Sequence, residues 1–236
     1  MRPYTRSLHP DDYAFLPHTE RLREFVCSMS VSGVPHRAWH QHRVWEYASI
    51  MQQLDELGVP KESQLVDVGS GASFFPPYLT TLGGYPNVTL VDSMQYGDIT
   101  SDVQAQRAFY GVQLPLLDLP VEDMQSIPSD CFDVTMCIST IEHVDVSRHD
   151  DALKELHRIT KPGGLIFITS DYFRDLEQFE RSPSRHLQQT PYTKYFVLTI
   201  PTKIDATFVG ETDLAYQGDF VHDAYSFVNI CLRKAG

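Results

Sequence analysis

Two aspartates and two glycines in the first half of the chain have the spacing of residues that bind a nucleoside. Asp67, Gly69 and Gly71 fall in the run DVGSGAS after an apolar stretch, and Asp92 ends the next apolar stretch. Glycine lets a chain turn from strand to helix while a ligand approaches the backbone, because it has no Cβ. A carboxylate at the end of the following strand can accept two hydrogen bonds from a ribose diol. The alternative for Asp92 is a strand-end aspartate that caps the next turn.

The residues after the glycines indicate which kind of nucleoside cofactor could bind. The dinucleotide fingerprint needs a further glycine at position 74 and an open helix N-terminus for a pyrophosphate. The chain has Phe74 at that position, followed by Phe75, Pro76 and Pro77. The pattern therefore disfavours an NAD-dependent oxidoreductase, the first alternative function. It favours a cofactor with one nucleoside and no phosphate.

Short apolar runs and helical stretches must position these residues, and the two alternate along the chain. Four runs are nearly continuous in apolar residues, as are strands buried on both faces of a parallel sheet: 64–69, 88–93, 132–139 and 164–170. Helical spacing separates them, as at 150–160, which Ser147 and Asp150 would cap. The alternation predicts an α/β fold with a doubly wound parallel sheet and helices on both of its faces.

The whole chain, 1–236, is expected to be a single domain. Its core is predicted over 38–172, beginning with an amphipathic helix that ends at Gly58. An N-terminal arm, 1–37, would precede the core. An insertion on the substrate side, 173–200, and C-terminal strands, 201–236, would follow it. The last two β-rich runs, ATFVGETDLAY and AYSFVNICLRK, predict an antiparallel pair at the sheet edge.

The charge balance bears on the class of partner. The chain carries 31 acidic and 19 basic residues, a formal net charge of -12. Binding a phosphate backbone needs a basic surface, so nucleic acid is disfavoured as a partner and a small molecule is favoured. No apolar run approaches the roughly 20 residues that span a bilayer, and the N-terminus has no apolar leader segment. We therefore expect a cytoplasmic location and no membrane partner.

Four segments, in order, resemble a known family over residues 61–172. LVDVGSGAS resembles motif I of class I S-adenosylmethionine-dependent methyltransferases, and LVDS resembles their second-strand acid. FDVTMCISTIEHV resembles their fourth strand with its loop, and LHRITKPGGLIFITS the next helix, glycine turn and fifth strand. The resemblance implies a Rossmann-like, mostly parallel sheet of seven strands with an antiparallel C-terminal hairpin at its edge. It also implies S-adenosylmethionine as cofactor and methyl transfer to a small-molecule acceptor, at oxygen or nitrogen, by in-line displacement.

Carried over by position, the resemblance assigns a cofactor role to eleven residues. The motif I residues would contact the methionine portion of the cofactor, and Asp92 would bind its ribose. The two residues after Asp92 would flank the adenine ring. One of two acidic residues before the fourth strand would bind the adenine amino group. The end of that strand would also line the cofactor. In chain order these residues are Asp67, Gly69, Ser70, Gly71, Asp92, Ser93, Met94, Glu122, Asp123, Cys137 and Ile138. Motif I usually has glycine where this chain has Ser73, and a serine fits there if its backbone stays in an ordinary helical region.

The triplet Trp45-Glu46-Tyr47 before motif I resembles a subset of these enzymes. In that interpretation Arg43 or Trp45 would help to cover the cofactor. The alternative is that Trp45 and Tyr47 are core residues of the amphipathic helix.

His143 follows the fourth strand, at the edge where parallel sheets place their ligands. An imidazole can accept a proton from a substrate hydroxyl or amine near neutral pH, so His143 is the candidate catalytic residue. The alternative is that it orders the loop by bonding Glu142 or the backbone. A cation site is disfavoured, because Asp150 and Asp151 fit the acidic first turn of a helix. Its ligands would be Glu142, His143, Asp145, His149, Asp150 and Asp151.

A second alternative function belongs to a different class. The chain could bind S-adenosylmethionine or another nucleoside on a methyltransferase fold without transferring a methyl group. Motif I and Asp92 predict binding, and they do not by themselves predict transfer.

Overall fold

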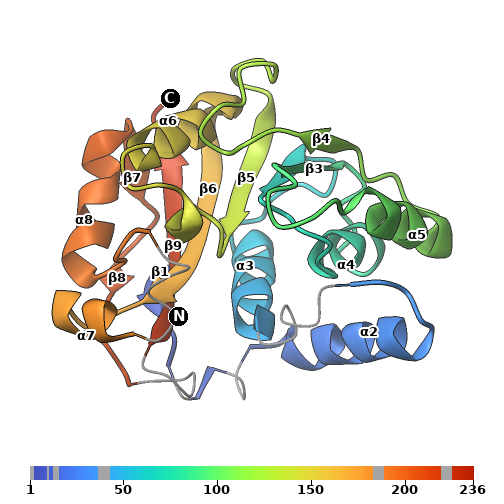
Figure 1. Ribbon diagram of the computed structural model, residues 1–236, viewed down its shortest axis with the longest axis horizontal. Coiled ribbons are helices and arrows are strands. Elements are labelled where there is room, and N and C mark those ends of the chain that lie inside the picture. Colours follow the sequence, from blue (N-terminus) through green and yellow to red (C-terminus); the bar gives the residue numbers. More distant parts are fainter. Residues whose placement is uncertain (1–2, 10, 13–15, 37–42, 183–188, 219–224) are drawn as a thin grey trace. The chain divides into compact units, whose positions relative to one another are not determined.

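The computed structural model describes residues 3–9, 11–12, 16–36, 43–182, 189–218 and 225–236. The chain forms two compact units, one of residues 11–120 and the other of residues 1–10 with 121–236. Figure 1 shows their helices and strands, and each unit is described by itself below. The single domain expected from the sequence stays a prediction.

The unit of residues 11–120 alternates helices with three parallel strands in the order β4-β3-β2. The register sets Asp67 beside Leu90 and Asp92 beside Asp118, so the strands end close together. Its elements are α2 (Thr19–Val31), α3 (Val44–Glu56), β2 (Leu65–Val68), α4 (Phe75–Thr81), β3 (Val88–Asp92), α5 (Thr100–Tyr110) and β4 (Leu116–Asp118). The apolar runs at 64–69 and 88–93 are therefore strands, as predicted.

Aromatic side chains pack α3 against the start of α4. The Tyr47 ring stacks on Phe75 at a centroid distance of 4.5 Å and meets Phe74 edge-on at 5.1 Å. All three rings are buried. Rings of this size each contribute roughly 1.5–3 kcal/mol when fully buried. The proline pair after Phe75 suits a helix start, because the first helical N–H groups have no partner within the helix.

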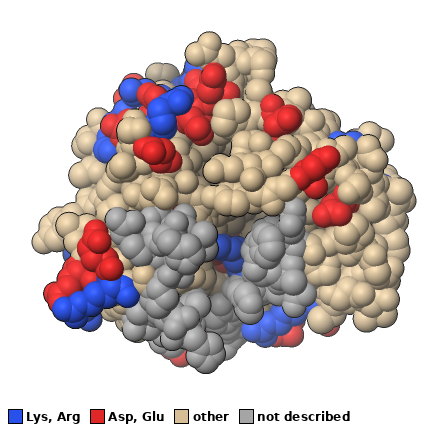
Figure 2. All heavy atoms as spheres, in the orientation of Figure 1, with Lys and Arg blue, Asp and Glu red and all other residues tan. Residues whose placement is uncertain are grey.

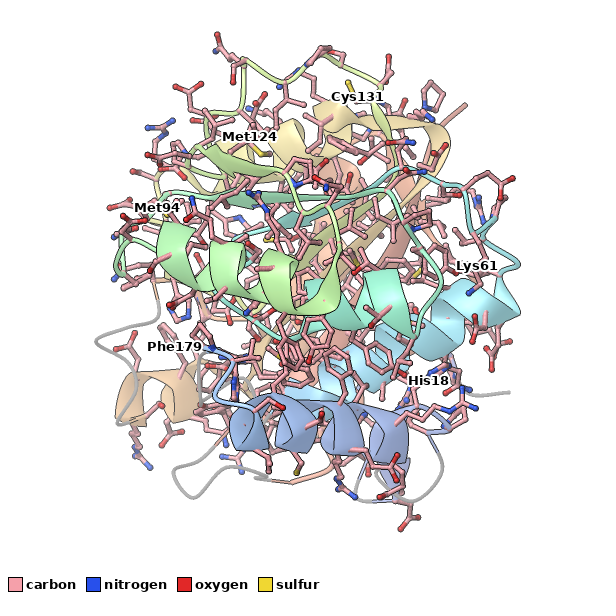
Figure 3. The ribbon with its side chains drawn as sticks, turned by 90° about the vertical axis from the view of Figure 1, so that its right-hand side faces the viewer. His18, Lys61, Met94, Met124, Cys131 and Phe179 are labelled. Carbon is pink, nitrogen blue, oxygen red and sulfur yellow. The ribbon has the colours of Figure 1, made fainter. Side chains whose placement is uncertain are left out.

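A polar contact ties the same helices together at the surface of this unit. The Nε2 atom of His18 lies 2.9 Å from Asp55 on α3, and its Nδ1 atom lies 3.3 Å from the Tyr78 hydroxyl on α4. Lys61 donates to the same carboxylate at 3.1 Å. Figure 3 labels His18, which precedes Asp55 in the chain, and Lys61, which follows it. Hydrogen bonds from Lys61 and His18 outweigh burial and hold the pKa of Asp55 below its usual range.

The other unit contains the strand order β5-β6-β9-β1-β8, with β7 also paired to β9. Strands β5 and β6 are parallel, whereas β9 runs antiparallel to β6, β1 and β7. Its elements are β1 (Thr5–Ser7), β5 (Phe132–Ile138), the 3-10 helix η2 (Ile141–His143), α6 (His149–Ile159), β6 (Thr160–Tyr172), α7 (Leu176–Arg181), α8 (Lys194–Lys203), β7 (Ala206–Phe208), β8 (Thr212–Asp213) and β9 (Ser226–Lys234).

The α/β class with a mostly parallel sheet is confirmed, and the strand count differs in detail. The described strands number nine rather than seven, because the short strands β1 and β8 add to the sheet. The predicted antiparallel pair is present as β7 and β9, but β9 lies inside the sheet with β1 on its far side from β6. The Thr5 hydroxyl accepts a hydrogen bond from the Cys231 N–H at 2.9 Å and donates to its carbonyl. This pairing between the two ends of the chain has no local sequence signal.

The expected cap on the helix before β6 is wrong. Helix α6 begins at His149 after Arg148, with no side-chain cap. The hydroxyl and N–H of Ser147 both donate to Asp145 Oδ1, at 2.6 and 2.8 Å. Ser147 is thus engaged in a local turn, which competes with capping. Among the residues described, no helix is both long and apolar enough to cross a bilayer.

Candidate cofactor and active site

The glycine loop after β2 is held by the end of β3. The N–H groups of Gly69 and Ser70 donate to the Val91 carbonyl at 2.7 and 3.2 Å. Gly69 has φ of 72° and Gly71 has φ of 54°. Residues with a Cβ rarely adopt this backbone region, so the turn favours glycine at both positions. The sequence prediction of a strand-to-helix glycine turn is confirmed.

Asp92 uses each carboxylate oxygen to fix a neighbouring backbone N–H group. Its Oδ2 atom accepts from Gly71 at 2.8 Å, and its Oδ1 atom accepts from Met94 at 2.9 Å. Met94, labelled in Figure 3, has φ of 54°, which this bond helps to stabilise. Asp92 therefore caps the turn. An ionised carboxylate has about four lone-pair sites, so both oxygens can still accept from a further donor.

Asp67 lies within β2 and is almost completely buried, with 2% of its surface exposed. Its Oδ1 atom accepts no hydrogen bond from the described residues. Burial raises the pKa of Asp67 to about 8, and the nearby Asp92 carboxylate contributes to the rise. A buried acceptor without a donor is costly, so this oxygen suits a ligand group that brings a hydrogen and a positive charge.

Ser73 occupies the place of the usual third glycine without backbone strain. Its φ is not positive, so its backbone does not require glycine at this position. Its hydroxyl accepts from the Phe75 N–H at 3.3 Å and is hydrogen-bonded to the Tyr47 side chain. Burial, the largest effect on that phenol, raises the pKa of Tyr47 far above its usual value.

Trp45 and Tyr47 are core residues, as the alternative interpretation of the triplet held. Trp45 is fully buried, and its indole N–H donates to Asp12 at 2.8 Å. Arg43 pairs with the buried Glu46 carboxylate at 3.3 Å. These contacts stabilise the helix that packs behind the glycine loop.

Gln106 on α5 is a supporting residue that the sequence did not reveal. It is buried, and its amide donates to the carbonyls of Pro35 at 2.9 Å and Ala72 at 3.4 Å. The second bond holds the backbone just after the two loop glycines. The sequence signal for such a role is a polar residue on the apolar side of a helix. That signal does not indicate which groups the side chain bonds.

Cys137 and Ile138 end β5 in the other unit, and both are buried. The next residue, Ser139, has φ of 44°. Its N–H donates to the Thr169 carbonyl at 3.0 Å and lies 3.1 Å from the Thr169 hydroxyl. The chain thus leaves β5 through a tight, strained turn. Strain of this kind costs about 1–3 kcal/mol and concentrates at functional sites.

His143 follows this turn as the last residue of η2. It is half-buried, and its backbone N–H donates to the Thr140 carbonyl at 3.0 Å. The neighbouring Glu142 is buried, and its carbonyl accepts from the N–H groups of Gln189 and Thr190. The segment before α8 is therefore fastened to the loop that carries His143.

His149 and Tyr192 form a buried polar pair in the same unit. The His149 Nε2 atom lies 2.8 Å from the Tyr192 hydroxyl. Burial lowers the pKa of His149 to about 4, and the charge of Lys203 contributes. On the exposed side of α6, Asp150 bonds Lys203 at 2.6 Å and Asp151 bonds Arg148 at 3.1 Å. No cluster of three potential metal ligands is found in the described part of the chain.

The predicted site residues are divided between the two units. Asp67, Gly69, Ser70, Gly71, Asp92, Ser93 and Met94 lie in the unit of 11–120, and Glu122, Asp123, Cys137, Ile138 and His143 lie in the other. Within the first unit the structure brings the glycine loop and the end of β3 into direct contact. Within the second, Glu122 is half-buried and Asp123 is exposed on the loop before β5.

Residues 66–168 match a family model described as a methyltransferase domain. This stretch therefore resembles the methyltransferase domain family. The match begins in β2 and ends in β6, so it includes the glycine loop, Asp92 and the turn with His143. The resemblance to class I methyltransferases is therefore confirmed.

Individual proteins resemble this chain in sequence or in structure. The ubiquinone biosynthesis O-methyltransferase of Pseudomonas syringae pv. tomato is 25% identical over 173 residues, 68% of this chain and 68% of the relative. The 1,6-didemethyltoxoflavin-N1-methyltransferase of Burkholderia thailandensis, solved with its namesake compound and S-adenosylhomocysteine, has a TM-score of 0.61 at 14% identity. That alignment covers 97% of this chain and 92% of the other.

A second similar structure carries a different kind of name. The [4+2]-cyclase SpnF has a TM-score of 0.64 at 15% identity, covering 81% of this chain and 82% of its own. Proteins similar to this chain are thus named for O-methylation, N-methylation and cyclisation. The fold alone therefore does not decide the accepting atom.

Proposed function

We propose that this protein is an enzyme that transfers a methyl group from S-adenosylmethionine to a small-molecule acceptor, at oxygen or nitrogen. The observation that supports this most is the glycine loop fastened to β3 through Val91 and Asp92. When bound, the cofactor supplies an electrophilic methyl carbon on a sulfonium. Under the proposal the residues assigned from the sequence hold it, from Asp67 through Ile138.

The free acceptors in the first unit fit the parts of this cofactor. The Oδ1 atom of Asp67, which accepts no hydrogen bond from the described residues, suits an amino acid ammonium group. Such a group would also favour the ionised carboxyl. The remaining lone pairs of Asp92 suit a ribose diol. Phe74 and Phe75 are fully buried at the start of α4, where a pyrophosphate would need exposed N–H groups. This packing argues against the NAD alternative.

Methyl transfer from a sulfonium is an in-line displacement, which needs no covalent enzyme intermediate. The residues of the chain would hold the acceptor atom, methyl carbon and sulfur collinear and exclude water. His143, in the turn after β5, would accept the proton that the acceptor loses. Its alternative role, ordering that turn, makes a different kinetic prediction, which is given below.

The acceptor is proposed to be a small molecule rather than nucleic acid. The net charge of -12 opposes binding to a phosphate backbone. Two similar proteins are named for methylation of small compounds. We also propose a cytoplasmic location, which agrees with four free cysteines in the described residues.

The proposal is tested by calorimetric titration with S-adenosylmethionine, S-adenosylhomocysteine and NAD. We expect both sulfur nucleosides to bind and Asp92→Asn to weaken them about tenfold to a hundredfold, since a charged hydrogen-bond acceptor is lost. Asp118→Asn is the matched control, because Asp118 ends the neighbouring strand and is exposed. It should leave both affinities unchanged. Tight NAD binding without a response to either sulfur nucleoside would refute the proposal.

A further inference from the structure

The loop before β5, residues 121–131, is fastened by its backbone to two side chains of α6. Glu155 Oε2 accepts from the Met124 N–H at 2.8 Å. Arg158 Nη2 donates to the Met124 carbonyl and Nη1 donates to the Ile127 carbonyl, both at 2.8 Å. One residue of the loop, Met124, is therefore held at both its N–H and its carbonyl.

Glu155 and Arg158 also hold each other in place. The Arg158 Nε and Nη2 atoms donate to the two Glu155 oxygens at 2.6 and 2.8 Å. The side chains are 13% and 28% exposed, so solvent screens this pair less than a surface pair. The Arg158 guanidinium holds the pKa of Glu155 below its usual range. The planar fork of an arginine can serve a carboxylate and two carbonyls together, which the single ammonium of a lysine cannot.

The acidic residues Glu122 and Asp123 belong to this fixed loop. Val121, Met124 and Ile127 are buried, whereas Glu122 is half-buried and Asp123 is exposed. The Glu122 carbonyl accepts from Arg148 Nη2 at 3.3 Å, so a second arginine of the same region holds the loop nearer its start. The backbone is therefore held on both sides of Asp123, at Glu122 by Arg148 and at Met124 by two side chains of α6.

Other charged side chains of α6 are more exposed than Glu155 and Arg158. Among them, Asp150, Asp151 and Lys154 form surface ion pairs. Figure 2 shows acidic and basic side chains gathered side by side over this helix. Exposed pairs of this kind contribute little, so a change there provides a control for a change at Arg158.

We propose that Glu155 and Arg158 are positioning residues that fix Glu122 and Asp123 for recognition of the adenine amino group, so that α6 sets the base specificity of the site. The inference rests on the proposed function, in which this loop meets the adenine. A hydrogen bond weakens steeply when donor and acceptor are misplaced, so selectivity for an amino group needs a carboxylate held in one position. The bonds from Glu155 and Arg158 supply that constraint.

The test compares S-adenosylhomocysteine with S-inosylhomocysteine, in which a carbonyl oxygen replaces the adenine amino group. We expect the wild type to bind the adenosyl compound about tenfold to a hundredfold more tightly, by calorimetry. In Arg158→Lys that preference should fall at least about fivefold, chiefly through weaker adenosyl binding, since lysine cannot hold both loop carbonyls. Lys154→Ala, on the exposed side of α6, should keep the wild-type preference.

Amide hydrogen exchange separates positioning from general destabilisation. The Met124 amide should exchange faster in Arg158→Lys while amides of β9 keep their protection. Glu155→Gln, which retains the side-chain shape, replaces Arg158→Lys if the lysine variant does not fold. A folded variant that keeps the full adenosyl preference would overturn the inference, and so would a wild type that binds both compounds equally. A wild type that binds neither compound would instead refute the proposed function.

Discussion

Asp67 is a buried carboxyl whose charged form is destabilised in the folded protein. Burial, assisted by the Asp92 charge, raises its pKa from 3.8 to about 8. Between these values the folded protein keeps a proton that the unfolded chain has lost. The contribution of this group to stability is therefore fully present below about pH 4 and is lost as the pH rises to about 8.

Replacing Asp67 by asparagine should remove this pH dependence. We expect the free energy of unfolding of Asp67→Asn, relative to wild type, to increase by up to about 1.4 kcal/mol per pH unit between the two pKa values. Above about pH 8 the difference should level off. Urea denaturation at several pH values without cofactor measures it. Parallel stability curves for the two proteins would show that Asp67 is already ionised at neutral pH.

The two roles considered for His143, proton acceptor and ordering of the turn after β5, lead to different predictions. Because it would accept a proton from the acceptor, His143→Ala should lower turnover about a hundredfold or more, within the range for general base catalysis. The affinity for S-adenosylhomocysteine should stay nearly unchanged. Turnover with a competent acceptor and the calorimetric affinity are the two measurements. Equal losses in both would instead favour the role of ordering the turn after β5.

At the scale of elements, the packing of α6 against the segment before α8 depends on a neutral histidine. His149 bonds Tyr192 and meets the Phe196 ring edge-on at 5.1 Å. Its folded pKa is about 4, below the ordinary 6.5. Between these values the unfolded chain binds more protons, so this contribution to stability is lost as the pH falls from about 6.5 to 4.

The wild type should therefore lose stability over that range by up to about 1.4 kcal/mol per pH unit from this group. His149→Gln should show a smaller slope in denaturation measured between pH 4.5 and 7. Tyr192→Phe is the informative control, because it removes the hydroxyl and leaves the histidine buried. It should lower stability at all pH values and keep the slope. If His149→Gln has the wild-type slope, another group is responsible.

At the scale of the whole molecule, the single domain predicted from the sequence can be tested by cooperativity. Trp45 is buried in the unit of 11–120. In a Trp39→Phe background its fluorescence reports on that unit, while hydrogen exchange at β9 reports on the other. We expect both probes to give one coincident unfolding transition in urea. Two separated transitions would indicate two domains.

The sequence by itself determined the elements and the residues that form the glycine turn. Strands buried on both faces are nearly continuous in apolar residues, and a turn with positive φ favours glycine, so these features have local signals. Asp92 was identified for the same reason, since its position at a strand end is visible in the sequence.

Tertiary structure alone decided which distant groups support those residues. The bonds of Gln106 to Ala72, and of Glu155 and Arg158 to the loop before β5, join segments far apart in the chain. Hydrogen bonds between distant segments leave no periodicity in a sequence, because any polar side chain can serve. The Ser147 cap failed for a related reason: Asp145 lay near enough to compete for the same hydroxyl. The sequence therefore predicts which residues hold the cofactor, whereas the contacts that fix those residues became visible only in the folded chain.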